Sequence, residues 1–383
     1  MTAIRHLYFH IPFCPKLCPY CSFYVEVGAQ NKNRDFLDAL LREVDRAGEK
    51  YALHPETIYF GGGTPTSLRT EQLEYLLGGL RERLDLSALR EWTVEANPAT
   101  VREEKARQLR VMGVTRVSLG VQSWDDALLK TLGRVHTAAQ AEQTYEVLRA
   151  SGIPAINLDL MFAVPGQRPS QWRATLEKTI EMQPDHISSY CLTYEEDTAY
   201  FQKLAGGDFR QDVERDAQLF EETMDTLTAG GFAQYEISNY ARRDGASLTE
   251  CTSPTNRESQ HNRAYWLGAD YLGFGPGAFS TVGFSRWENV RDTAAFTRGI
   301  LGDAPAFGVR EELDEATRAG EIAAFRIRMA EGIPRTDITR WSEAIAEFER
   351  IGLLHEVSGN LRLTRRGKLL ADSVAEAFVS IPS

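Results

Sequence analysis

The chain has 383 residues and a formal net charge of −11, because 43 Lys and Arg stand against 54 Asp and Glu. This length exceeds what one hydrophobic core usually serves, so we expect more than one domain. The acidic balance excludes a generally basic surface for nucleic acid, and the odd count of five cysteines argues against a disulfide scaffold. We find no apolar run of membrane-spanning length and no secretory signal. We therefore expect a cytoplasmic protein that is not an integral membrane protein.

Over its first two thirds the chain alternates short strand-like runs with amphipathic helical segments, a rhythm typical of a parallel sheet or barrel. Gly113, Gly133 and Gly152 stand where helices are expected to end. Six such units fall short of the eight in a closed barrel. We therefore predict an α/β fold with an incomplete (βα)6 barrel, and periodicity leaves a doubly wound sheet open. The expected strands are His6–His10, Thr57–Phe60, Trp92–Glu95, Thr115–Leu119, Ala155–Leu160 and His186–Tyr190.

Three cysteines, Cys14, Cys18 and Cys21, follow the first expected strand within a span of eight residues. Three thiolates at this spacing can hold an iron–sulfur cluster and leave one iron without a protein ligand, where a chelating cofactor can bind. A zinc site usually needs four ligands. His10 is near enough to be the fourth, but the run lacks the usual paired Cys-x2-Cys layout. The spacing therefore favours a cluster.

A glycine-rich run, Gly61-Gly62-Gly63-Thr64, comes directly after the second expected strand. Glycines allow the backbone to approach a ligand closely and expose its amide and carbonyl groups. No lysine follows as in a phosphate-binding loop, and the dinucleotide fingerprint is absent. The alternative is that this run forms a tight turn and binds no ligand. The neighbouring cysteines favour a loop that contacts a ligand.

Polar residues recur at the ends of the expected strands. Alternation places Asn157 and Asp159 on one strand face, Glu95 ends its strand, and Gln122 follows another. Tyr8 shares a face with His10 on the strand before the cysteines. Any one of them could be a capping hydrogen bond. Together they favour a polar ligand pocket at the mouth formed by the loops.

The C-terminal part changes character near Pro305. From Glu311 onward it reads as helices, two short strands around a turn at Ser358-Gly359-Asn360, and a final helix, which predicts a winged-helix-like domain. Residues 335–376 carry seven Arg or Lys and seven Asp or Glu. This balance does not indicate a basic face for binding DNA. We expect a packing or partner-docking domain. We expect three divisions: 1–240 for the barrel, 241–305 for a connecting segment, and 306–383 for this C-terminal domain. Within the connecting segment, the glycine-rich residues 268–280 are expected to lead the chain back to the core.

The cysteine triplet and the Gly-Gly-Thr-Pro loop resemble the radical S-adenosylmethionine superfamily. The resemblance implies a [4Fe–4S] cluster held by Cys14, Cys18 and Cys21, with S-adenosylmethionine chelating the fourth iron. By motif position it implies a pocket for S-adenosylmethionine formed by Tyr8, Gly62, Gly63, Thr64, Glu95, Gln122, Arg134 and Asp159.

Within that superfamily, nearly the whole chain resembles the oxygen-independent coproporphyrinogen oxidase group. The matching motifs are Tyr8–Cys14, Glu95–Pro98, Gly120–Ser123 and Asn157–Met161. One branch oxidatively decarboxylates coproporphyrinogen III, has a further cysteine two residues after the third ligand, and carries a longer N-terminal extension. Here position 23 is Phe23, and 13 residues precede Cys14.

This pattern resembles the heme-chaperone branch, whose members bind heme and deliver it to heme-accepting proteins, including acceptors at the membrane face. It implies a protein without the dehydrogenase activity. That dehydrogenase, or a radical enzyme acting on another substrate, are the alternatives.

The segment His261-Asn262-Arg263-Ala264-Tyr265-Trp266 resembles the HNxxYW motif associated with heme in that branch. A neutral imidazole can bind heme iron, and aromatic side chains can pack on a porphyrin. The resemblance therefore implies heme binding by His261, Tyr265 and Trp266. The alternative is that His261 caps a helix and the two aromatic residues belong to the core.

Three positions depart from the family pattern or stand outside it. Ala163 replaces a usual glycine. Cys251 is expected to be a free surface cysteine, with heme ligation as the alternative. Cys191 is expected to be a small buried residue near the pocket.

Overall fold

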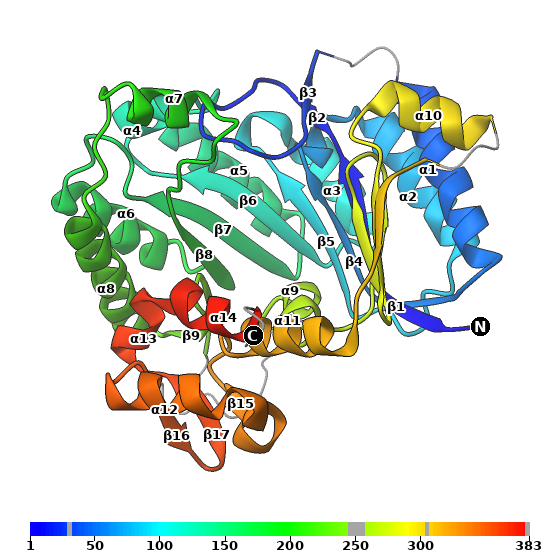
Figure 1. Cartoon of the computed structure of the whole chain (residues 1–383). Helices are drawn as coiled ribbons and strands as arrows, with labels where there is room; N and C mark the ends of the chain where they lie inside the picture. The colour runs from blue at the N-terminus through cyan, green and yellow to red at the C-terminus, as the bar shows by residue number, and fades with distance from the viewer. Residues whose placement is uncertain (29–32, 244–256, 303–305, 380–383) are drawn as a thin grey trace.

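The computed structural model describes residues 1–28, 33–243, 257–302 and 306–379, and its main element is an open nine-stranded sheet (Figure 1). The strand order is β11-β1-β4-β5-β6-β7-β8-β10-β9. All pairs from β11 to β8 are parallel, whereas β10 is antiparallel to both of its neighbours. The bounds are β1 Ala3–Ile11, β4 Ala52–Gly62, β5 Glu91–Ala96, β6 Arg116–Gln122, β7 Ala155–Phe162, β8 His186–Cys191, β9 Phe232–Glu236, β10 Asn239–Arg242 and β11 Leu272–Phe274.

The predicted fold class is confirmed. All six expected strands form, in chain order and in parallel, as β1 and β4 to β8. The edge strands β11 and β9 do not pair with each other among the described residues, so the barrel is incomplete. The sheet is wider than six strands. The segment 268–280, expected to be a connection, supplies β11 beside β1, and β10 and β9 extend the opposite edge beyond β8.

Helices cover the outer face of the sheet, and the concave face remains open toward the viewer in Figure 1. In α2 the residues Leu73, Leu76, Leu77 and Leu80 are fully buried, as their spacing of three and four requires. Each such side chain contributes roughly 1.5–3 kcal/mol on burial. The helices on this part of the chain are α1 Asn33–Gly48, α2 Thr70–Arg83, α3 Glu103–Val111, α4 Asp126–Thr131, α5 Ala138–Ala150, α6 Pro169–Glu181, α7 Ala199–Ala205 and α8 Val213–Ala229.

The glycines expected to end helices do so. Gly113, Gly133 and Gly152 lie two residues beyond α3, α4 and α5, with φ of 99°, 71° and 78°. Only glycine enters this left-handed region without steric cost, so a helix end could be read from sequence at each of the three positions.

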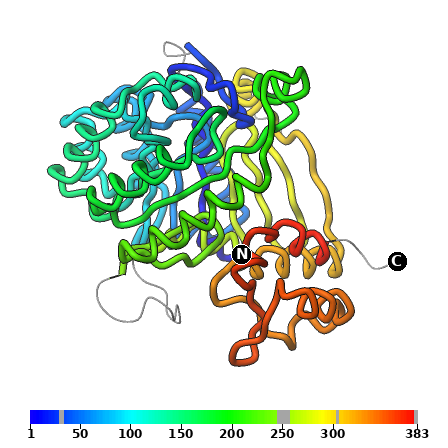
Figure 2. Tube along the Cα trace, turned by 90° about the vertical axis from the view of Figure 1, so that its left-hand side faces the viewer, coloured from blue at the N-terminus to red at the C-terminus, as the bar shows by residue number. Residues whose placement is uncertain are grey.

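The remaining chain adds a second sheet and a C-terminal lobe, which lies below the barrel in Figure 2. The lobe has its own core around Ile327, Trp341 and Leu361. Its strands β16 and β17 are joined by Ser358 and Gly359, both with positive φ, as a two-residue hairpin turn requires. The expected turn and strand pair are thus present. The elements are α9 Gln260–Trp266, β12 Phe279–Val282, β13 Ser285–Asn289, α10 Thr293–Leu301, β14 Phe307–Glu312, α11 Glu315–Arg326, β15 Ile333–Pro334, α12 Ser342–Arg350, β16 Leu354–Val357, β17 Asn360–Leu363, α13 Arg365–Leu369 and α14 Ala371–Val379.

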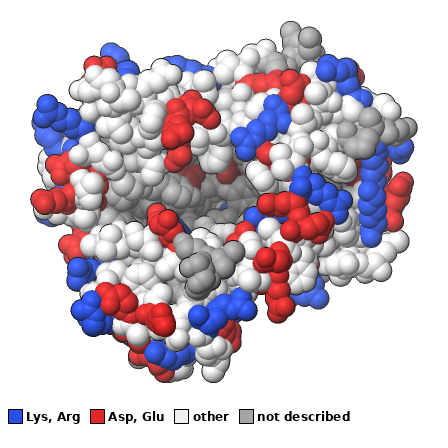
Figure 3. Space-filling model, in the orientation of Figure 1, with Lys and Arg blue, Asp and Glu red and all other residues white. Residues whose placement is uncertain are grey.

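Charged residues of both signs mix on the face shown in Figure 3, around a central hollow. This face therefore offers no continuous basic surface. Among the described residues, no helix has the length and apolar character needed to cross a bilayer.

Candidate cofactor site

The cysteine loop and the carboxyl ends of the barrel strands enclose one cavity of about 500 Å³. Ten of the eleven residues predicted for the cluster and for S-adenosylmethionine line it: Cys14, Cys18, Cys21, Gly62, Gly63, Thr64, Glu95, Gln122, Arg134 and Asp159. They come from six parts of the chain: the cysteine loop, the ends of β4, β5 and β6, the segment after α4, and β7. The strand ends gather at one edge because the strands are parallel, which is why the polar residues after them converge.

Tyr8 is the exception. Its hydroxyl forms a 3.2 Å hydrogen bond with His10 Nδ1, and its ring stacks on Tyr59 with centroids 6.1 Å apart. Tyr8 therefore supports the cavity wall from behind and is not among the lining residues.

The three cysteine thiols are half-buried and unpaired. Cys14 Sγ lies 3.4 Å from the Thr64 hydroxyl, and Arg134 Nη1 donates to Cys18 Sγ at 3.7 Å. Burial raises the pKa of the Cys14 and Cys21 thiols. A nearby cationic centre would offset that effect and favour the thiolates that bind iron.

The zinc alternative loses its fourth ligand. Both ring nitrogens of His10 are engaged, Nδ1 with Tyr8 and Nε2 with the Tyr24 carbonyl oxygen at 2.8 Å. Among the described residues, no group of three His, Cys, Asp or Glu side chains is placed so that it could hold a single metal ion. A cluster has no such requirement, since each thiolate binds a different iron.

The glycine loop is packed so closely that side chains would not fit. A Cβ on Gly62, whose φ is 99°, would lie 2.4 Å from His10 Cε1, and one on Gly63 would lie 2.7 Å from the Pro12 carbonyl carbon. The glycines therefore serve the packing of β4 against β1, and they also leave the backbone at positions 62 and 63 facing the cavity.

Two buried carboxyl groups face this cavity. Tyr59 donates a 2.7 Å hydrogen bond to Glu95, and Asp159 accepts hydrogen bonds from Ser118 at 3.0 Å and Asn157 at 2.7 Å. Burial raises the pKa of Glu95 to about 7 and that of Asp159 to about 6. Ionising both buried carboxyl groups at once costs free energy, and a positive charge nearby lowers that cost. The pair therefore favours a cationic ligand in the cavity.

Arg134 and Gln122 complete the polar wall. Arg134 Nη2 donates to the Gly120 carbonyl oxygen at 2.9 Å, which holds the guanidinium beside Cys18. Gln122 has a positive φ of 69°, and its side-chain Oε1 is buried without a hydrogen-bond partner among the described residues. Strained backbone and an unsatisfied buried acceptor both point to a ligand at this position.

Sequence reasoning missed Tyr59, which lines the cavity and binds Glu95. Strand alternation from Thr57 to Gly61 could have placed it on the inner face. The expectation for Cys191 was wrong in one respect: it lines the cavity, as expected near a pocket, but it is exposed, because it ends β8 at the mouth. Ala163 adopts a φ of 60°, which explains why glycine is favoured there.

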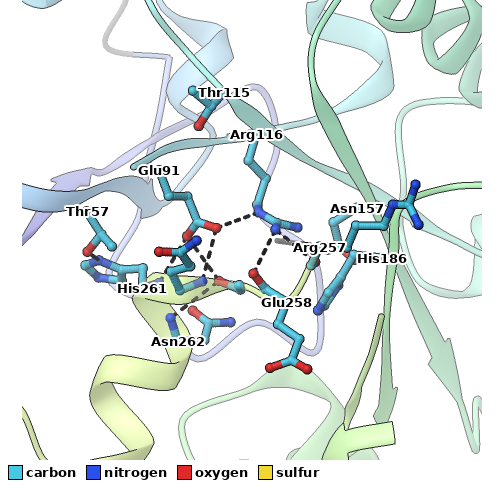
Figure 4. A network of polar contacts seen from close by, with 12 residues as sticks. Thr57, Glu91, Thr115, Arg116, Asn157, His186, Arg257, Glu258, His261 and Asn262 are labelled. Carbon is cyan, nitrogen blue, oxygen red and sulfur yellow. Dashed lines mark hydrogen bonds and ion pairs between the residues drawn. The ribbon is translucent and has the colours of Figure 1, made fainter. Parts of the chain in front are cut away.

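His261 lies beside Glu91 and Arg116, the first residues of β5 and β6, and therefore near the amino-terminal ends of these strands (Figure 4). It is 1% exposed, and its Nδ1 lies 2.7 Å from the Thr57 hydroxyl. Its backbone N–H donates to Glu91, which forms a buried ion pair with Arg116 at 2.9 Å. Burial lowers the pKa of His261 to about 3, so its ring is neutral.

The rest of the motif is also packed inward. The Tyr265 ring lies 4.3 Å from Tyr271, and Trp266 packs on Phe325 with centroids 6.1 Å apart. In the described conformation His261 is buried and the two aromatic side chains are half-buried against their neighbours, so heme binding by His261, Tyr265 and Trp266 stays a prediction. Cys251 lies outside the described residues.

Comparisons with known proteins add the family context. Residues 8–179 match the family described as the Radical SAM superfamily. The chain is 32% identical to "Heme chaperone HemW" of Bacillus subtilis over 98% of the chain and 99% of that protein, and 33% identical to the protein of that name from Escherichia coli over 98% of each. It is also 35% identical to "Radical S-adenosyl methionine domain-containing protein 1, mitochondrial" of Mus musculus, over 96% of the chain and 82% of that protein.

A solved structure titled "Coproporphyrinogen III oxidase (HemN) from Escherichia coli is a Radical SAM enzyme" has a TM-score of 0.84 to this chain. The match covers 99% of this chain and 91% of that one at 22% identity. This similarity concerns the fold.

Proposed function

Because the chain belongs to the HemW family of the radical SAM superfamily, we propose that it binds heme and delivers it to heme-accepting proteins. The proposal draws on similarity that extends over almost the full length of curated heme chaperones. Phe23 agrees with this branch, since it stands at the rim of the cavity where the dehydrogenase branch has a cysteine.

Membership of the superfamily implies a [4Fe–4S] cluster and S-adenosylmethionine. We assign the cluster to Cys14, Cys18 and Cys21. The observation that carries this assignment is that all three line one cavity together with Arg134, Glu95 and Asp159. When bound, the cluster would offer an open iron for S-adenosylmethionine to chelate and would be the electron source for any reduction of its sulfonium.

The residues around the cavity have distinct tasks in this proposal. Glu95 and Asp159 would attract the ammonium and sulfonium charges of S-adenosylmethionine, while Arg134 would attract its carboxylate. The backbone of Gly62 and Gly63 would face the methionyl part, and the Thr64 hydroxyl, 3.4 Å from Cys14 Sγ, would donate to the cluster-binding thiolate. Tyr59 orients the Glu95 carboxylate through its 2.7 Å hydrogen bond.

The part of His261 in heme binding requires a conformational change. The ring is 1% exposed, its Nδ1 lies 2.7 Å from the Thr57 hydroxyl, and its Nε2 has no hydrogen-bond partner among the described residues, so the residues that cover Nε2 have to move before it can reach heme iron. A His261→Ala variant that retains full heme affinity would remove the ligand assignment and leave the rest of the proposal intact.

The test uses anaerobically reconstituted protein. We expect a Soret shift on titration with hemin, transfer of the heme to an apo-hemoprotein, and no turnover of coproporphyrinogen III. Turnover without stable heme binding would instead support the dehydrogenase alternative.

A further inference from the structure

A second cavity, of about 710 Å³, lies between the barrel and the C-terminal lobe. Its walls come from α8 and β9 on the barrel side and from β16, β17 and α13 on the lobe side, at the lower left of Figure 1. The volume lies within the range of small-molecule sites. Neither the proposed cluster nor S-adenosylmethionine uses it, because it shares no lining residue with the cofactor cavity.

The chemistry of this lobe cavity is unusual for a chain with net charge −11. Four cationic side chains line it, and Asp225 is its single carboxylate. Most of the uncharged lining is apolar, and Thr228 and Gln234 add two polar side chains. The cations are Arg328, Arg362, Arg365 and Lys368, and the apolar lining residues are Met224, Ala229, Ala233, Met329, Ala330 and Leu363. An apolar molecule with carboxylates at its edge matches this combination.

One of the cations is available for a ligand. Arg362 lines the cavity, and its guanidinium forms no side-chain hydrogen bond or ion pair among the described residues; its Nε is buried without a partner. By contrast, Arg365 is already paired with Asp225 at 2.6 Å, and Arg328 lies 3.3 Å from Glu236. A guanidinium that lines a cavity without a carboxylate partner favours an incoming carboxylate, which can bind its terminal N–H groups.

An exposed histidine stands next to that arginine. His355 and Arg362 are direct partners across the β16–β17 pair, so their side chains leave the same face of the sheet, and both line the cavity. The other histidines are less accessible, except His54, which lies 3.3 Å from Asp85. Among the described residues, His355 is thus the exposed imidazole that combines with a cavity and a free cation.

The aromatic motif reaches the same cavity from behind. The Arg328 guanidinium lies over the Trp266 ring, 5.4 Å from its centroid, and Trp266 also packs against the cluster that contains Met329. Arg328 and Met329 both line the cavity. The segment that resembles a heme motif therefore supports this wall, although His261 itself is buried elsewhere.

We infer that the lobe cavity is a heme-binding site in which the His355 imidazole ligates the iron and the Arg362 guanidinium binds a propionate. This inference rests on the proposed heme-carrying function and names a site for it. Ligation needs only a neutral ring nitrogen and a vacant axial position on the iron, so no oxidant or reductant takes part.

The test is a hemin titration of the anaerobically reconstituted full chain, read by difference spectra, with His355→Ala and, as the matched control, the exposed His54→Ala. We expect His355→Ala to weaken hemin binding at least about tenfold, as expected for loss of one strong ligand bond, and to change the Soret position. His54→Ala should behave as the wild type. Wild-type affinity and spectrum in His355→Ala would overturn the site and leave the proposed function standing, whereas a wild-type chain that binds no hemin would overturn both.

A second measurement tests the propionate contact. Arg362→Gln should weaken hemin binding by about tenfold, the usual effect of losing a charge-assisted hydrogen bond. It should not weaken binding of hemin dimethyl ester, which has no carboxylate to lose. Equal losses for hemin and for the ester would show that Arg362 does not contact a propionate and would contradict that part of the inference.

Discussion

The Tyr59 phenol donates a 2.7 Å hydrogen bond to Glu95 in the cofactor cavity, while its ring stacks on His261 with centroids 5.1 Å apart. One side chain thus touches both ends of the barrel interior. A change at the His261 end can reach the Glu95 carboxylate through a single ring.

The affinity for S-adenosylmethionine should depend on pH. The folded pKa of Glu95 is raised to about 7, mainly by burial, so the carboxyl becomes neutral as pH falls through that value and loses its attraction for a cationic ligand. We expect binding, measured by equilibrium dialysis, to weaken by up to about tenfold per pH unit below about 7. Glu95→Gln should retain only the dependence from Asp159, whose pKa is about 6. An unchanged pH profile in Glu95→Gln would show that another group controls binding.

Tyr59→Phe should move the same profile. The Tyr59 hydrogen bond lowers the pKa of Glu95, so its loss lets that pKa rise and shifts the midpoint for S-adenosylmethionine binding to higher pH. The control is Tyr75→Phe, which removes a tyrosine hydroxyl from Asp38 on the outer helices. If both variants keep the wild-type midpoint, the Tyr59 contact has no influence on the ligand.

Single Cys→Ser changes at positions 14, 18 and 21 should each abolish stable cluster assembly, because serine replaces the thiolate that iron requires. Bound iron and acid-labile sulfide after anaerobic reconstitution provide the measurement. Cys191→Ser is a demanding control, since Cys191 lines the same cavity and is exposed. Loss of the cluster in Cys191→Ser would contradict the assignment of the three ligands.

Glu91→Gln should destabilise the fold by about 3–5 kcal/mol, because it leaves a buried Arg116 charge without its partner. The Glu91 and Arg116 side chains are 5% and 3% exposed, and Glu91 also accepts N–H groups at the start of α9. Chemical denaturation measures the change in the free energy of unfolding. Arg310→Gln, which breaks an exposed ion pair with Glu312, should leave stability almost unchanged. Similar losses in both variants would mean that burial of the Glu91 pair contributes nothing.

Local patterns in the sequence determined the barrel strands, the helix ends and the position of the loop that carries the three cysteines. Strand alternation and helix spacing depend on residues a few positions apart, and glycine at positions 113, 133 and 152 reflects the φ angle of its own backbone. The convergence of Glu95, Gln122 and Asp159 on one cavity followed from the same reasoning, because parallel strands present their carboxyl ends at one edge.

Only the tertiary structure decided what lies around those patterns. The burial of His261 depends on Thr57, 204 residues away in the chain, and on the ion pair between Glu91 and Arg116. The strand β11 forms because β1 offers an open edge, and the lobe cavity exists because β17 packs near α8. Such long-range contacts leave no periodic signal in the sequence, since their energy depends on how separate elements meet in space.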